Sequence, residues 1–203
     1  MSTSRKPAGE TIYQLKVTLK GIRPPVWRRF QVASDTSLDE LHEIIQMVMG
    51  WENWHLYVFK IGDTPYSDPD PDWGFDVKDS TRTNLSQVVR GANRKFIYEY
   101  DMGDGWEHEI LVEKTLPTEP GQHYPVCVTG RRACPPEDCG GVWGYAELLE
   151  IIKDPEHEEY EERMEWLGGE LDPEAFDVDQ VNELLRGASS QGVQINSNGD
   201  YPS

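Results

Sequence analysis

Apolar and polar residues alternate along the first part of the chain, which is typical of a half-buried β-strand. Leu15, Val17 and Leu19 share one face with Tyr13, whereas the positions between them are polar or charged. The prolines at 24 and 25 interrupt the pattern, since proline cannot donate a hydrogen bond to a neighbouring strand. Alternation resumes and continues to Val32, so we predict an antiparallel strand pair over residues 12–32.

The next stretch has apolar residues at helical spacing, at Leu38, Leu41, Ile44, Ile45 and Val48. Ser37 and Glu40 fit a capping box, and Gly50 can adopt the left-handed conformation that ends a helix. These signals predict a helix over residues 38–49. Residues 55–61 then favour a strand by composition, so the chain opens as strand, strand, helix, strand.

Two further alternating runs, residues 96–100 and 106–113, lie on either side of the glycine-containing turn Asp101–Gly105. Such a turn between two strand-like runs predicts a β-hairpin. If the aromatic face of the first strand coincides with the His108 face of the second, His108 lies among aromatic side chains near Asp101 and Asp104.

The remainder of the chain is loop-rich at first and then predominantly helical. We predict a short helical turn over residues 85–89 and a connection over residues 117–125. Beyond it, apolar stripes predict helices that begin near Tyr145, at Asp154-Pro155 and near Val178, the last two ended by Gly168 and Gly187.

These elements predict one α+β domain over residues 12–187, with a mainly antiparallel mixed sheet. Its strand-strand-helix-strand start is β-grasp-like, and its C-terminal part is a helical extension. The polar ends, residues 1–11 and 188–203, are expected to be disordered.

Composition supports a globular protein outside the membrane. Hydrophobic residues make up 37% of the chain and aromatic residues 10%, enough for a packed core. No apolar run approaches the roughly 18 residues that span a bilayer, and the N-terminus lacks an apolar signal segment. We therefore expect a cytoplasmic protein without a membrane partner. Its odd number of cysteines, three, argues against a secreted disulfide framework.

The net charge of −18 is unevenly distributed. Residues 1–33 carry seven Lys or Arg against one acid, and the rest of the chain carries twelve against thirty-six. A nucleic-acid partner is therefore not expected, because such partners are held by cationic contacts. A basic patch is confined to the first strands, at Lys16, Lys20, Arg23, Arg28 and Arg29, and we interpret it as a solvated sheet face or an internal partner for the acidic half.

All three cysteines lie in the segment from Cys127 to Tyr145, which also holds two prolines and four glycines. Cys127 and Cys134 with His108 are a candidate zinc site, and His123 or His157 are alternative third ligands. The spacings between the cysteines are longer than those of tight zinc knuckles. The alternative is that the thiols are small buried groups that pack a proline-braced loop, with no cofactor.

Two groups of residues are candidates for catalysis. The first is Glu137 and Asp138, held by the preceding prolines; either can act as a base or ligand, or can instead cap the following helix. The second is Asp101, Asp104 and His108, which can hold a cation or carry a proton, or can instead be turn and core residues. The aromatic residues Tyr100, Trp106, Trp143 and Tyr145 beside them are candidates for binding.

A series of motifs in this order resembles the plasmid pRiA4b ORF-3-like family over roughly residues 12–186. The motifs are Ser37-Leu-Asp-Glu-Leu-His42, Gly50-Trp51 with His55-Leu56, Tyr98 to His108, Cys134-Pro-Pro-Glu-Asp-Cys-Gly-Gly141, Gly144-Tyr145 and Asp154-Pro-Glu-His157. Met102 replaces a common Phe, and the family admits Val at position 139. The resemblance implies a single α+β domain and no established activity, although some relatives are labelled transposon resolvases.

Three hypotheses about function follow. The first is a non-enzymatic module, associated with mobile elements, that binds an unknown protein or small molecule. It is favoured because no Gly-rich phosphate loop, G-x-S-x-G elbow or H-E-x-x-H motif is present. The second is a metal-binding protein or metal-dependent enzyme that uses Cys127, Cys134 and His108, with Glu137 as base. The third is DNA binding or recombination through the basic face of residues 12–32.

Overall fold

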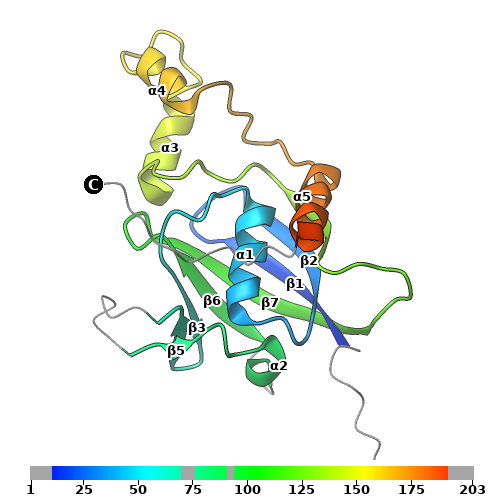
Figure 1. The fold of residues 1–203 in the computed structure, drawn as a ribbon. Coiled ribbons are helices and arrows are strands. Elements are labelled where there is room, and N and C mark those ends of the chain that lie inside the picture. The colour runs from blue at the N-terminus through cyan, green and yellow to red at the C-terminus, as the bar shows by residue number, and fades with distance from the viewer. Residues whose placement is uncertain (1–10, 70–75, 91–93, 192–203) are drawn as a thin grey trace, which may run out of the picture.

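The computed structural model describes residues 11–69, 76–90 and 94–191 (Figure 1). Eight strands form one mixed, mostly antiparallel sheet in the order β5-β4-β3-β6-β7-β1-β2-β8. Among the described strands, only β4 and β5 pair in parallel. The strands are β1 (Thr11–Leu19), β2 (Trp27–Ala33), β3 (Tyr57–Ile61), β4 (Thr64–Ser67), β5 (Lys78–Asp79), β6 (Lys95–Tyr100), β7 (Trp106–Pro117) and β8 (Val126–Arg131).

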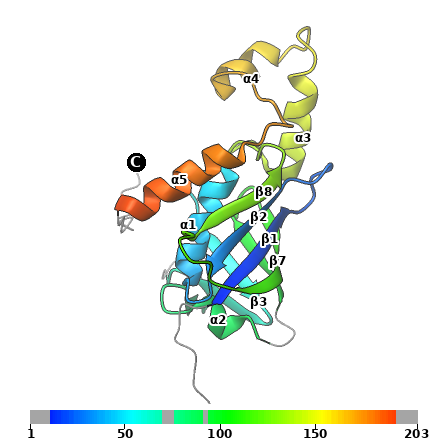
Figure 2. The same ribbon diagram turned by 90° about the vertical axis from the view of Figure 1, so that its right-hand side faces the viewer.

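In the described part of the chain five helices accompany the sheet: α1 (Leu38–Met49), α2 (Leu85–Val88), α3 (Gly141–Ile151), α4 (Tyr160–Leu167) and α5 (Val178–Gln191). Figure 2 shows α1 and α5 on the same side of the sheet, whereas α3 and α4 project beyond its end. No helix among the described residues has the length and apolar composition needed to cross a bilayer.

The elements predicted from local signals are confirmed. Helix α1 has the predicted bounds, its capping box joins Ser37 and Glu40, and Gly50 ends it with φ +90°. The strand pair of residues 12–32 and the hairpin of residues 96–113 are also present. In the hairpin, Tyr98 faces His108 and Tyr100 faces Trp106, so the aromatic face and the His108 face coincide as predicted.

Four predictions about the elements are corrected or not confirmed, and a fifth falls mostly outside the described residues. The cysteine segment contains an unpredicted strand, β8, which pairs with β2. Helix α4 begins at Tyr160 rather than at Pro155, and α5 continues past Gly187 to Gln191. The β-grasp-like detail is not confirmed, because β3 pairs with β4 and β6, and two strands separate it from β1. The predicted disordered ends, apart from Thr11 and residues 188–191, lie outside the described residues.

The two faces of the sheet have different surroundings. One face packs against α1 through fully buried residues of every long strand, among them Leu15, Phe30, Phe59, Tyr98 and Ile110. The other carries cross-strand ion pairs, Lys20 with Glu107, Arg29 with Glu113, Lys60 with Glu99 and Lys95 with Glu109. The polar positions of the sequence pattern therefore form a solvated, charge-paired face.

Candidate functional site

Three connections meet at one end of the sheet. They are residues 50–56 between α1 and β3, residues 100–106 around the β6–β7 turn, and residues 134–144 leading into α3; together we call them the three-loop site. Trp51 donates from Nε1 to the carbonyl of Pro135 at 2.9 Å. The amide of Gly140 donates to Asp104 Oδ2 at 3.1 Å. The cysteine segment is thus fastened to both other connections.

Glu137 ties the three-loop site together. The Tyr100 hydroxyl donates to Glu137 Oε1, and the amide of Glu52 donates to Oε2 at 2.7 Å. The same Tyr100 hydroxyl accepts from the amide of Trp54 at 2.9 Å and from that of His55 at 3.3 Å. Burial, followed by the Glu137 carboxylate, raises the pKa of Tyr100 well above its usual value, so this tyrosine remains a hydrogen-bond donor. Glu137, a predicted base, has both oxygens engaged in holding loops.

His55, Asp101 and Asp138 form the group in the described part of the chain whose atoms come close enough to share a metal ion, all within 4.8 Å of one another. His55 Nε2 lies 3.0 Å from Asp138 Oδ1 and 3.7 Å from Asp101 Oδ2. Each connection of the three-loop site supplies one of the three residues. Asp101 and Asp138 were predicted as candidates for catalysis, whereas His55 was predicted to lie in a strand.

The backbone around this group is unusual. Asn53, Asp101 and Asp138 have positive φ angles of 61°, 55° and 58°, one in each connection of the three-loop site. Side chains other than glycine seldom adopt this left-handed conformation, although Asn and Asp tolerate it best. At Asp101 the turn is held by its own carboxylate, since Oδ1 accepts from the amides of Gly103 and Asp104. Such backbone strain is concentrated at functional sites in proteins.

His108 lies in the core rather than at this site. It is fully buried, its ring contacts Trp51 and Tyr98, and neither ring nitrogen has a hydrogen-bond partner in the described residues. Burial lowers the pKa of His108 to about 4, so the ring is neutral at physiological pH. The prediction that it lies among aromatic side chains is confirmed, but no contact joins it to Asp101 or Asp104 in the described chain.

The three cysteines are free thiols. Cys127 on β8 is buried and donates weakly to the carbonyl of Arg29 at 3.7 Å. Burial raises the pKa of Cys127 to about 11 and that of Cys139 to about 12, and it raises the pKa of Cys134 further. Thiols with such pKa values are poor ligands and nucleophiles, since thiolate is the reactive form.

Cys127, Cys134 and His108 are not gathered as the sequence analysis proposed. Among the described residues, the group that can share an ion consists of His55, Asp101 and Asp138 and contains no cysteine. Cys127 lies on the edge strand β8, whereas His108 lies on β7, with β1 and β2 between these strands. Spacing along the chain gave no information on this separation across the sheet.

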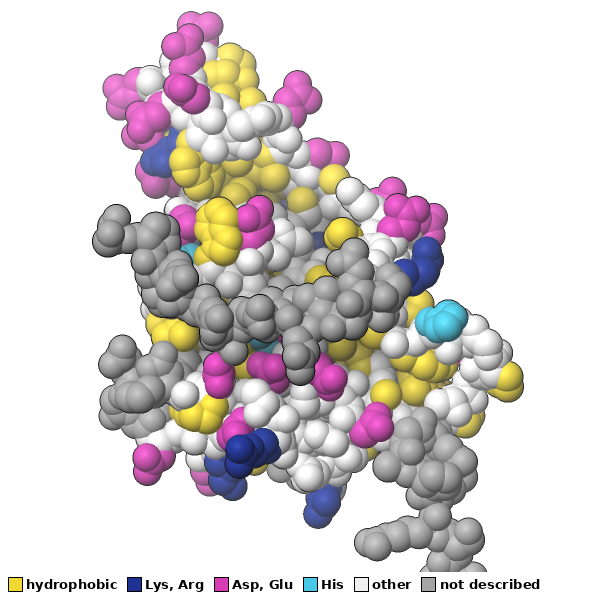
Figure 3. All heavy atoms as spheres, in the orientation of Figure 1, with side chains coloured by type: hydrophobic (Ala, Val, Ile, Leu, Met, Phe, Trp, Pro, Cys, Tyr) yellow, Lys and Arg dark blue, Asp and Glu magenta, His cyan; other side chains and the backbone are white. Residues whose placement is uncertain are grey.

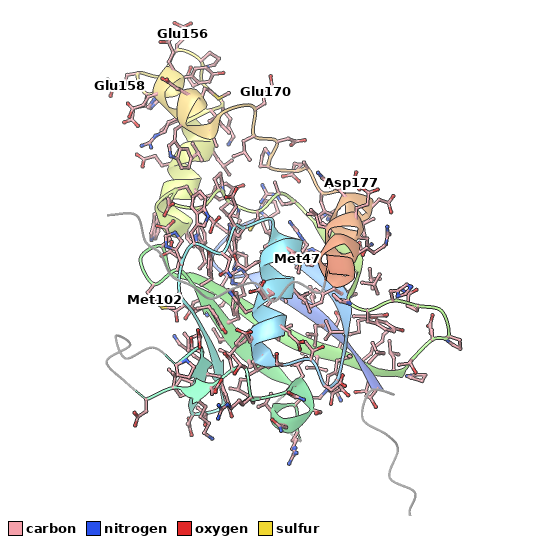
Figure 4. The ribbon with its side chains drawn as sticks, in the orientation of Figure 1. Met47, Met102, Glu156, Glu158, Glu170 and Asp177 are labelled. Atoms are coloured by element: carbon pink, nitrogen blue, oxygen red, sulfur yellow. The ribbon has the colours of Figure 1, made fainter. Side chains whose placement is uncertain are left out.

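The aromatic candidates divide between core and surface. Tyr100, Trp106 and Tyr145 are buried, so they shape the three-loop site from beneath and cannot contact a partner directly. Trp143 is 86% exposed. Trp54, Leu56 and Met102, which flank His55 and Asp101 in sequence, are exposed as well. Figure 4 shows Met102 at the β6–β7 turn, pointing away from the sheet.

The basic residues of the first strands are engaged within the molecule. Arg29 and Lys20 pair with Glu113 and Glu107 of β7. Arg28 is buried and donates to the carbonyls of Val48, Trp27 and Arg131. The interpretation as a solvated sheet face agrees with the contacts of Lys20 and Arg29, whose partners come from β7 rather than from the acidic C-terminal half, but not with the burial of Arg28.

A surface pocket lies elsewhere, between the β7–β8 connection and α5. It has a volume of about 230 Å³ and is lined by Gly121, Gln122, His123, Pro125, Val126, Asn182 and Arg186. Of the candidate residues only His123, an alternative zinc ligand, lines it, and no residue of the three-loop site does, so this pocket is separate from the three-loop site.

Replacing Glu137 with Gln is expected to destabilise the protein by about 1–2 kcal/mol. Both carboxylate oxygens of Glu137 accept a hydrogen bond, and the side-chain NH₂ group of Gln would face one of these two donors, the Glu52 amide or the Tyr100 hydroxyl. Urea denaturation followed by tryptophan fluorescence measures the change. Glu52→Gln is the matched control, since the backbone amide of Glu52, not its side chain, takes part in this contact. Equal stability of the two variants would show that Glu137 does not tie the loops.

Comparisons with known proteins agree on one family. A family model described as plasmid pRiA4b ORF-3-like protein matches residues 11–180. The uncharacterized protein y4hQ of Sinorhizobium fredii is 42% identical over 177 residues, which cover 86% of this chain and 91% of that protein. The crystal structure of a protein of unknown function, MM3350 from Methanosarcina mazei Go1, is 42% identical with a TM-score of 0.77, over 84% of this chain and 97% of that one.

Proposed function

The chain belongs to the plasmid pRiA4b ORF-3-like family, and from that premise we propose that it is a non-enzymatic module that binds a protein partner through the three-loop site. The observation that carries the proposal is the exposure of large apolar side chains on all three connections. Trp54 is 60% exposed and Trp143 86%, and Leu56 and Met102 are exposed as well. Tryptophan is the residue type most enriched among energetically dominant contacts in protein interfaces.

The charge of the three-loop site indicates the chemistry of the partner. Residues 50–56, 100–106 and 134–144 contain no Lys or Arg, and their acids are Glu52, Asp101, Asp104, Glu137 and Asp138. A partner segment that carries Lys or Arg beside apolar side chains complements such a surface, whereas a phosphate backbone is repelled. Figure 3 shows hydrophobic and acidic side chains next to one another over the α3–α4 end of the molecule.

Four of the five predicted catalytic groups form structural contacts or lie in the core, which supports binding over catalysis; the fifth, Asp138, is half-exposed. Glu137 holds two connections, Asp104 accepts from Gly140, and Asp101 closes its own turn. His108 is buried without contact to solvent. Proton transfer requires a group that is free to reach a substrate, and hydrogen bonds within the protein or burial hold these four groups in place.

Two further parts of the proposal rest on single observations. A cytoplasmic location is supported by the three free cysteines, since disulfides are rare in that compartment. An association with mobile genetic elements is supported by the family description, which refers to a plasmid reading frame.

Selection from a random peptide display library tests the proposal. We expect enrichment of peptides in which Lys or Arg adjoins aromatic residues, with binding that weakens as salt is raised. The double variant Trp54→Ala, Trp143→Ala is expected to bind the enriched peptides at least about 30-fold more weakly, since a dominant tryptophan contributes about 2 kcal/mol or more. Trp166→Ala, which removes an exposed tryptophan from α4, is the matched control and should bind normally.

Two results would contradict the proposal. One is the absence of any enriched basic peptide. The other is an enriched peptide whose affinity is the same for the double variant as for the natural protein. Because Trp54 takes part in the loop contacts through its backbone amide, alanine keeps that bond, and the double variant is expected to fold normally.

A further inference from the structure

His55, Asp101 and Asp138 have the spacing of ligands around one small cation. His55 Nε2 lies 3.0 Å from Asp138 Oδ1 and 3.7 Å from Asp101 Oδ2. Around a tetrahedral ion with bonds of about 2.0–2.1 Å, neighbouring ligand atoms are about 3.3 Å apart. The two separations lie on either side of this value, and the three ligand atoms all lie within 4.8 Å of one another, so the side chains can close around one ion.

The orientation of the histidine is a second observation that points to a ligand. His55 Nε2 is shielded from solvent and forms no hydrogen bond, although Asp138 Oδ1 is only 3.0 Å away. A distance this short without a hydrogen bond means that the in-plane direction of Nε2 does not point at the oxygen. Ligand atoms that share an ion have this relation, since each is directed at the ion.

Asp101 adds an uncommitted oxygen from a buried side chain. Its carboxylate is 9% exposed, and Oδ1 accepts from the amides of Gly103 and Asp104. Oδ2 accepts no hydrogen bond from the described part of the chain and faces His55. A carboxylate oxygen that accepts no hydrogen bond is available to a cation.

The three residues are held in place by contacts outside the group. The amide of His55 donates to the Tyr100 hydroxyl, which also donates to Glu137, the neighbour of Asp138. Asp101 and Asp138 are fixed in left-handed conformations. Such supporting contacts orient metal ligands in proteins and raise the affinity of a site.

We propose that His55, Asp101 and Asp138 bind one divalent transition-metal cation, with Zn²⁺ as the best fit. One imidazole nitrogen with two carboxylate oxygens suits zinc, whereas calcium and magnesium prefer sites made of oxygen alone. Three protein ligands leave a coordination position open to water or to a donor from a partner. The cation joins the three connections that carry the exposed apolar residues, but its binding does not depend on the existence of a partner.

Isothermal titration of the chelator-treated, tag-free protein tests the site with Zn²⁺, and with Ca²⁺ and Mg²⁺ for comparison. We expect one Zn²⁺ per chain and much weaker binding of the other two ions. His55→Gln and Asp138→Asn are each expected to weaken Zn²⁺ binding by more than about 100-fold. This loss is larger than the loss of about 10–100-fold that follows when a residue that only supports a ligand is replaced. His123→Gln is the matched control, because His123 lies in an exposed loop outside the group.

Several outcomes would overturn the assignment. They are the absence of stoichiometric Zn²⁺, unchanged affinity in His55→Gln or Asp138→Asn, and loss of Zn²⁺ binding in a Cys127→Ser, Cys134→Ser variant, which would place the ion at the thiols. Circular dichroism of each variant separates a lost ligand from a lost fold. Peptide binding is measured separately, so the metal site and the proposed partner surface can fail independently.

Discussion

Lowering the pH from 7.5 to 5 is expected to reduce the free energy of unfolding by about 4 kcal/mol, through two buried histidines. Burial lowers the pKa of His42 from 6.5 to about 3 and that of His108 from 6.5 to about 4. The folded protein therefore resists protonation of both rings, whereas the unfolded chain accepts protons below pH 6.5. Stability is full above this value and falls as the pH decreases toward 4.

The surroundings of the two rings explain the size of the effect. His42 contacts the Tyr98 hydroxyl at 2.8 Å and Asn53 Oδ1 at 2.7 Å, and its ring stacks on Tyr57. His108 is fully buried, and only contacts with the backbone of Trp106 and Tyr98 offset part of the cost of a charge there. Each histidine contributes about 1.4 kcal/mol per pH unit within its window, and a typical protein is stable by only about 5–15 kcal/mol.

Urea denaturation at pH 7.5, 6.5, 5.5 and 5.0, followed by tryptophan fluorescence, measures this dependence. His108→Leu is expected to lose about half of it, and His123→Gln, in an exposed loop, should retain all of it. Glu107 and Glu113 have pKa values that are lowered chiefly by hydrogen bonds from Lys20 and Arg29. Their stabilising effect is therefore lost only below about pH 4.5, outside the range of this experiment. Constant stability from pH 7.5 to 5 would contradict the burial of neutral histidines.

The variant Gly144→Ala is expected to destabilise the protein by about 2–3 kcal/mol, although alanine normally favours a helix over glycine by about 1 kcal/mol. Gly144 lies within α3, and a Cβ atom there would be 2.0 Å from the carbonyl oxygen of Cys139. That oxygen belongs to the backbone of the cysteine segment. Relief of the clash requires α3 and the segment to move apart, which disturbs the three-loop site.

Gly187→Ala is the matched control for this prediction. Gly187 lies within α5, where an added Cβ meets no atom of the described residues within 4 Å, so alanine is expected to stabilise the protein by up to about 1 kcal/mol. Chemical denaturation at pH 7.5 gives both values. The same sign of effect in the two variants would mean that α3 is not packed against the cysteine segment in solution.

Together these contacts give the cysteine segment a definite role. Its thiols are protonated and packed, and its prolines and acids fasten it to the other two connections. Asp138 alone in the segment combines exposure with a place in the His55 group. The segment of the three cysteines, which is the most distinctive feature of the sequence, thus supports the group of His55, Asp101 and Asp138, which the sequence did not reveal.

Local signals predicted a large part of the fold. Helix α1 followed from its apolar spacing, its capping box and Gly50, all of which act within a few residues. The β6–β7 hairpin followed from alternation around a glycine turn. Strand β8 was missed because it is short and its partner, β2, lies about a hundred residues earlier, so its pairing leaves no local periodic pattern.

The candidate site was predicted in part. Asp101, Glu137 and Asp138 were identified from turn and loop composition, and the structure brings them to one place. His55 was assigned to a strand, but β3 begins only at Tyr57, and no pattern separates a ligand histidine from a strand residue. His108 was selected because it is near turn acids in sequence, yet the alternation of the strand directs it into the core.

The sequence by itself determined the family, the α+β class, the first helix, the strand pairs at the start and centre of the chain, and the concentration of acids outside the first strands. Only the tertiary structure decided which titratable groups meet. The reason is physical: caps, turns and periodicity are short-range properties of the chain, whereas the meeting of His55, Asp101 and Asp138 depends on long-range packing. That packing, through Trp51, Tyr100 and Glu137, brings three distant connections to one end of the sheet.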